Sequence, residues 1–81
     1  MSASKAEIRT WLESSPKDVS HMIVVRDTFD YEDYPIYVDK GEDVQKLVDH
    51  YDNKPSSKTV EVYNLKMDHQ KQLREKHSWH I

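Results

Sequence analysis

The sequence predicts one α+β domain over residues 1–81, with the element order αββαβα. Two segments alternate apolar and polar residues, as strands do, and two others place apolar residues at helical spacing. A third observation is the uninterrupted apolar run "HMIVV", which suits the central strand of a sheet. The expected sheet has three strands, is mainly antiparallel in the spatial order 2-1-3, and carries its helices packed on one face.

The first helix is expected from about residue 5 to residue 14. Ser4 followed by Glu7 forms a capping-box pattern, which satisfies free backbone N–H groups at a helix start. Apolar residues then follow at the i, i+3 and i+4 spacing of one helix face: Ile8, Trp11 and Leu12. Pro16 ends the segment, because proline cannot continue a helix.

Two strands are expected next, joined as an antiparallel hairpin. The first is "HMIVV" at 21–25, a β-branched run without alternation. The second follows an acidic stretch and alternates its apolar residues: Tyr34, Ile36 and Val38. Pro35 cannot donate a ladder hydrogen bond, so this strand is expected at an outer edge of the sheet or to begin near the proline.

The second half of the chain predicts a helix, a strand and a last helix. "DKGED" at 39–43 holds the only glycine and places carboxylates near a helix start. A helix is then indicated by residues at i, i+3, i+4 and i+7: Val44, Leu47, Val48 and Tyr51. The loop-like cluster at 52–58 precedes an alternating strand at 59–65. Asp68 is expected to cap a helix over 69–77.

These elements predict one hydrophobic core in a domain of this size. Its expected members are Ile8, Trp11, Leu12, Ile23, Val25, Ile36, Val38, Val44, Leu47, Val48, Val60 and Val62.

Composition narrows the classes of function. With no cysteine, neither a disulfide framework nor a thiolate zinc site is available, and a reducing compartment is expected. The first residues lack the pattern of a secretion signal, and no run approaches the roughly 18 apolar residues of a membrane span. A cytoplasmic protein without membrane partners is therefore the expectation.

Charge is distributed unevenly along the chain, whose net charge is −3. Residues 1–26 carry four bases and three acids, residues 27–53 two bases and nine acids, and residues 54–81 six bases and three acids. The acidic middle third argues against a general nucleic-acid binder, which presents a continuous basic surface to phosphate.

The acidic middle also predicts the candidate site. "RDTFDYEDYPIYV" at 26–38 holds four carboxylates and four aromatic rings. Aromatic rings are enriched at interface hot spots, and neighbouring carboxylates can meet lysine or arginine on a partner. The expected partner-binding residues are Asp27, Phe29, Asp30, Tyr31, Glu32, Asp33, Tyr34, Glu42 and Asp43.

Other interpretations of this stretch stay open. Its acids could simply keep an edge strand soluble and unavailable for pairing, and Tyr34 and Tyr37 could be sheet packing. A hard cation could also bind carboxylates, although the spacing of these four matches no established metal-binding loop: Asp27, Asp30, Glu32 and Asp33. No metal ligand and no cofactor is assigned on this basis.

The remaining chemistry-bearing residues do not predict an enzyme. His69, His77 and His80 come near one side of a helix, but no carboxylate or recognised spacing accompanies them, and packing of the tail explains them equally. No serine has a glycine elbow around it, and a single glycine excludes phosphate-cradling loops. No catalytic residue is therefore predicted.

Two segments carry a family resemblance. "SHMIVVRDTFDYEDYPIYVDKGEDV" and "EVYNLKMDHQKQL" resemble a family of small tailed-bacteriophage proteins with the core "HMIVV.DTFD.EDYPVYV..GEDV". The resemblance runs from about Lys5 to the C-terminus, and Arg26 stands where the family pattern has a cysteine. It implies a phage origin and an intracellular setting, and it implies no assigned activity or functional residue.

Three functions follow as hypotheses. The first is a phage accessory protein that binds a host protein with a basic surface, in the host cytoplasm, and modulates or inhibits it stoichiometrically, as anti-defence proteins do. The alternative is capture of a small ligand such as a nucleotide signal, which would need a homo-oligomer and basic residues of the last third: Lys66, Lys71, Arg74 and Lys76. The third is a metal-dependent hydrolase.

Overall fold

The computed structural model describes residues 3–81 and has six elements in the expected order. They are α1 (Lys5–Glu13), β1 (Val19–Asp27), β2 (Glu32–Asp39), α2 (Val44–Asp52), β3 (Ser57–Asn64) and α3 (His69–Arg74). The strands form one sheet in the order β2-β1-β3, and β1 is antiparallel to both neighbours. The predicted α+β class, element order and strand order are confirmed.

The central strand β1 is buried on both faces. Met22, Ile23, Val24 and Val25 are each at most 1% exposed. Successive side chains of a strand point to opposite faces, so Ile23 and Val25 pack against α2, whereas Met22 and Val24 pack against α1. A strand covered on both faces needs no polar positions, which explains the run "HMIVV".

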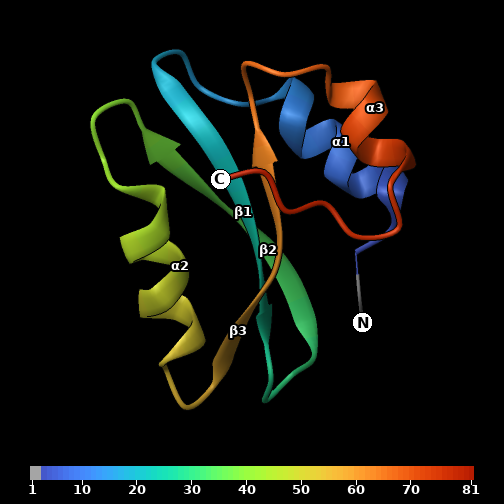
Figure 1. Ribbon diagram of the computed structural model, residues 1–81. Helices are drawn as coiled ribbons and strands as arrows, with labels where there is room; N and C mark the ends of the chain where they lie inside the picture. Colours follow the sequence, from blue (N-terminus) through green and yellow to red (C-terminus); the bar gives the residue numbers. More distant parts are fainter. Residues whose placement is uncertain (1–2) are drawn as a thin grey trace.

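The helices therefore cover both faces of the sheet, which corrects the expectation that they lie on one face. Figure 1 shows α2 on one side of the sheet and α1 with α3 on the other. The expectation was wrong because an unbroken apolar run does not reveal whether one face or both are covered. Two core clusters result instead of one.

The α2-side cluster consists largely of residues predicted for the core, whereas the α1-side cluster holds three that were not. Met22, Val24 and Tyr63 are fully buried there. Four predicted core residues are only partly buried: Trp11, Ile36, Leu47 and Val60. Tyr63 escaped prediction because all helices were expected on one face of the sheet, whereas α1 covers the other face, on which the Tyr63 hydroxyl donates to Glu61 at 2.6 Å.

All three helices begin at a side-chain cap. Ser4 accepts from the N–H of Glu7, and the Glu7 carboxylate accepts from the N–H of Ser4, which completes the predicted capping box. Asp43 and Asp68 each accept from two N–H groups in the first turn of α2 and α3. These caps satisfy donors that a helix start leaves free.

Helix α3 is shorter than predicted and is followed by a tail that pairs with β3. The helix ends at Arg74 instead of extending to residue 77. Backbone N–H of Val62 donates to Ser78 at 2.9 Å, and N–H of His80 donates to Val62 at 3.0 Å. The tail thus covers part of the outer edge of β3, and it closes an edge that otherwise offers free backbone groups.

Gln72 connects α3 to the end of β3. Its Oε1 accepts from the N–H of Asn64 at 2.8 Å, and its Nε2 donates to the carbonyls of Asn64 at 2.9 Å and Asp68 at 3.2 Å. The Gln72 side chain is fully buried. The bond to the Asn64 N–H gives a partner to a backbone donor next to a buried side chain, so the amide is expected to stabilise the fold.

We expect Gln72→Ala to lower the free energy of unfolding by about 1–3 kcal/mol, because it removes the acceptor of the Asn64 N–H, while the Asn64 carbonyl keeps its bond from the N–H of Met67. Gln70→Ala, on the exposed side of the same helix, should change it by less than about 0.5 kcal/mol. Urea denaturation followed by circular dichroism measures both. Equal effects of the two substitutions would show that the Gln72 hydrogen bonds do not contribute.

His21 on β1 has one ring nitrogen paired and one buried without a partner. Nδ1 lies 2.8 Å from the Ser20 hydroxyl, while Nε2 has no hydrogen-bond partner among the described residues. Burial lowers the pKa of His21 from its ordinary value of 6.5, and the nearby charge of Lys66 lowers it further. The folded protein therefore favours neutral His21.

Because the folded pKa of His21 lies below the unfolded value, its neutral form supports folding above pH 6.5, and that support is lost as pH falls through the folded pKa. We expect the free energy of unfolding to drop on acidification less steeply in His21→Gln than in the unchanged protein. Unfolding at a series of pH values gives both slopes, and NMR titration of the ring gives the pKa directly. A His21 pKa at or above 6.5 would contradict this account.

Candidate functional site

The turn between β1 and β2, residues 28–31, is held in one conformation by Asp27. Its Oδ1 accepts from the N–H of Phe29 at 2.8 Å and of Asp30 at 3.4 Å, and its carbonyl accepts from the N–H of Tyr31 at 2.6 Å. An aspartate side chain that accepts a hydrogen bond from the backbone N–H two residues later commonly stabilises a turn. Thr28 N–H donates to Ser56 at 3.0 Å, which ties the turn to the loop before β3.

The turn presents two aromatic rings to solvent. Phe29 is 84% exposed and Tyr31 is 65% exposed, and Tyr31 takes a left-handed backbone conformation with φ of 57°. Asp30 and Glu32 beside them are exposed as well. We call these four residues the hairpin tip: Phe29, Asp30, Tyr31 and Glu32.

Asp33 does not belong to this exposed surface. Its side chain is only 3% exposed, and its Oδ1 accepts from Nε of Arg26 at 2.9 Å. Its Oδ2 accepts from the N–H of Ala3 at 2.9 Å. Asp33 pairs across the strands with Arg26 and binds the N-terminal segment, so its carboxylate serves the fold.

The two tyrosines of β2 are packing residues. Tyr34 packs against the cluster under α2, and the Tyr37 hydroxyl donates to the carbonyl of Trp11 at 2.7 Å. Burial is the main cause that raises the pKa of each phenol. Of the four aromatic rings in residues 26–38, only those of Phe29 and Tyr31 are largely exposed and can therefore contact a partner.

Glu42 and Asp43 lie at the other end of β2 from the hairpin tip. The eight residues of β2, at about 3.3 Å per residue, separate the two ends by roughly 23 Å. Glu42 accepts from the N–H of Asp39 at 3.2 Å, and Asp43 caps α2. The structure therefore does not bring these two acids together with the tip, although they are close to it in sequence.

The remaining acids and histidines do not converge. Within residues 3–81, no group of three or more histidine, aspartate or glutamate side chains is arranged to hold a metal ion. His69 contacts the carbonyl of Leu65, and His77 contacts the carbonyl of Val60. His80 contacts Glu75 at 2.6 Å. The histidines considered as a set thus have separate partners.

A polar cluster that sequence spacing did not indicate lies under α1. Glu61, which is buried, accepts from the Tyr63 hydroxyl and from Lys5 Nζ at 3.2 Å. Burial and the bond to Glu61 raise the pKa of Tyr63 strongly. Asp33 and Glu61 both line a cavity of about 250 Å³ there, but each carboxylate already has a cationic partner.

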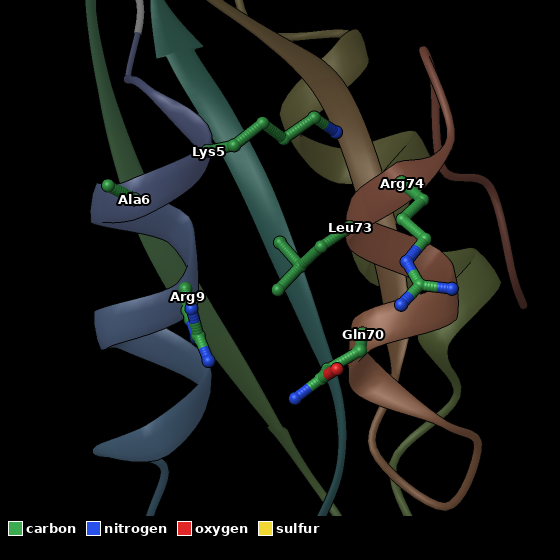
Figure 2. A pocket seen from close by; sticks show the side chains of 6 residues that line it. All are labelled: Lys5, Ala6, Arg9, Gln70, Leu73 and Arg74. Carbon is green, nitrogen blue, oxygen red and sulfur yellow. The ribbon is translucent and has the colours of Figure 1, made fainter.

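A second cavity of about 340 Å³ lies between α1 and α3 (Figure 2). Arg74, one of the basic residues considered for a small ligand, lines it together with two basic residues from α1, Lys5 and Arg9. Lys76 lines the smaller cavity instead, and Lys66 and Lys71 are exposed. Sequence reasoning missed the contribution of α1, because the two helices lie at opposite ends of the chain.

Comparison of the chain with protein-family models, with curated proteins and with solved structures finds no match. Among the residues that the structure describes, no helix has the length and apolar character needed to cross a bilayer.

The different positions of Asp33 and Asp30 give a direct test of their roles. We expect Asp33→Ala to lower the free energy of unfolding by about 1–3 kcal/mol. The substitution removes the buried carboxylate that accepts hydrogen bonds from Arg26 and from the N–H of Ala3. Asp30→Ala, at the exposed tip, should change it by less than about 0.5 kcal/mol. Chemical denaturation of both variants measures the two free energies of unfolding. Similar losses would contradict a structural role for Asp33 that Asp30 does not share.

Proposed function

We propose that this protein is a binding module that attaches to another protein through the hairpin tip and modulates or inhibits it stoichiometrically. The observation that carries the proposal is the exposure of Phe29 and Tyr31 on a turn whose backbone is held by Asp27. The proposal therefore rests on a smaller surface than the nine residues indicated by the sequence.

Large exposed rings on an ordered turn favour binding for two reasons. Each ring can bury a large area in a partner pocket, and an aromatic side chain loses few torsional degrees of freedom when it binds. The hydrogen bonds from Asp27 restrict the turn before binding, which lowers the entropy lost on association. The rest of the protein keeps its large apolar side chains mostly packed in the two core clusters.

The acids beside the rings indicate the character of the partner. Asp30 and Glu32 are exposed, and neither has an ion pair among the described residues. Carboxylates around an apolar centre favour association with a basic surface and make the association rate depend on salt. We therefore expect a partner with an apolar pocket that lysine or arginine residues surround.

The resemblance of the strand and turn segments to small tailed-phage proteins supports a host protein as this partner and the host cytoplasm as the setting. Stoichiometric binding suits this role, because inhibition of a host defence protein needs only a surface that covers or distorts its target. On this proposal the protein is not an enzyme.

The tip can be removed without disturbing the core. Phe29→Ser combined with Tyr31→Asn deletes both rings, and asparagine tolerates the left-handed conformation at residue 31. We expect the double variant to keep the stability of the unchanged protein and to bind the partner at least about 100-fold more weakly, since hot-spot rings each contribute about 2 kcal/mol or more. Met67→Ser, which removes an exposed apolar side chain elsewhere, is the matched control.

The measurement starts with capture from a bacterial host lysate and continues with the purified captured protein in isothermal titration calorimetry. Asp30→Lys combined with Glu32→Lys should weaken the complex mainly at low salt, where charge attraction is strongest. Equal binding by the ring-deleted variant and the unchanged protein would exclude the tip as the interface.

A further inference from the structure

The first and last helices lie on the face of the sheet opposite α2 (Figure 1), and a groove with basic lining residues runs between them. Its lining comes from one face of each helix: Lys5, Ala6 and Arg9 of α1, and Gln70, Leu73 and Arg74 of α3. Residues four apart on a helix lie on the same side. The spacings of Lys5 with Arg9 and of Gln70 with Arg74 therefore place each pair on one side of its helix, where all four residues line the groove.

The side chains divide the groove into an apolar floor and a polar rim. Figure 2 shows Leu73 and Gln70 extending from α3 toward α1, with Arg9 lying along α1. Leu73 also packs against the core cluster that includes Ile8 and Tyr63, so the floor is anchored to the domain. The volume of about 340 Å³ falls at the lower end of the range for small-molecule sites, roughly 300–1,000 Å³.

Three of the six lining residues are cationic and none is acidic. Lys5 is already paired with the buried Glu61 at 3.2 Å, so its charge is largely offset. Arg9 has only an exposed pair with Glu13 at 3.3 Å, of a kind that contributes little in water. Arg74 has no ion pair among residues 3–81. Two guanidinium groups therefore remain able to receive an anion.

We propose that this groove binds a small organic phosphate, a phosphomonoester that carries a flat or apolar group, such as a nucleoside monophosphate. Guanidinium groups present parallel N–H donors that match phosphate oxygens, so Arg9 and Arg74 hold the phosphate. The flat group lies on Leu73 and Ala6, and the Gln70 amide offers one donor and one acceptor to its edge. This function is separate from the hairpin tip and does not depend on it.

Titration of the ¹⁵N-labelled full chain with adenosine monophosphate, followed by NMR, tests the proposal. We expect saturable shifts of the amides in α1 and α3, and weakening of the affinity by at least about tenfold in both Arg9→Gln and Arg74→Gln. Lys46→Gln on α2 removes the same charge from the opposite face and should leave the affinity unchanged. The ring-deleted tip variant should also bind adenosine monophosphate normally.

Parallel titrations with inorganic phosphate and with adenosine separate the two parts of the ligand. Both should bind more weakly than adenosine monophosphate if the phosphate and the flat group each contribute. Equal affinity for inorganic phosphate would overturn the apolar part of the site, and equal affinity for adenosine would overturn the phosphate part. No saturable shift up to about 10 mM adenosine monophosphate, or equal weakening by Lys46→Gln, would overturn the proposal as a whole.

Discussion

The burial of β1 on both faces is the constraint on which the rest of the structure depends. Residues 3–81 form one three-stranded sheet, and its central strand has apolar side chains on either side of the backbone. Water must be excluded from both faces, so α2 covers one and α1 with α3 cover the other. This requirement places the first and last helices side by side on one face and so creates the groove between α1 and α3.

The helices and strands could be predicted because they depend on interactions between residues close in sequence. The packing of these elements against one another could not be predicted in the same way. Ser4, Asp43 and Asp68 act on backbone groups a few residues away, so their capping roles follow from sequence spacing. By contrast, Glu61 and Lys5 are 56 residues apart, and their pairing depends on how α1 lies over the sheet. The number of covered faces likewise depends on where each helix packs, which an unbroken apolar run does not specify.

The candidate site shows the same limit at the level of single carboxylates. Asp27, Asp30 and Asp33 are three positions apart, yet the first holds the turn, the second is exposed, and the third is buried against Arg26. Glu42 follows in sequence but lies at the opposite end of β2. Charge counted along the chain therefore overstated the acidic surface, because strand alternation and strand length decide where each carboxylate lies.

The remaining charge is arranged so that the two proposed sites can act independently. The hairpin tip carries two carboxylates, Asp30 and Glu32, that form no ion pair within residues 3–81, while the groove between α1 and α3 carries guanidinium groups. Opposite signs favour different ligands, and the charged side chains of both sites lie outside the two core clusters. Loss of binding at one site without loss at the other therefore identifies a local contact, whereas loss at both indicates a change in the fold that supports them.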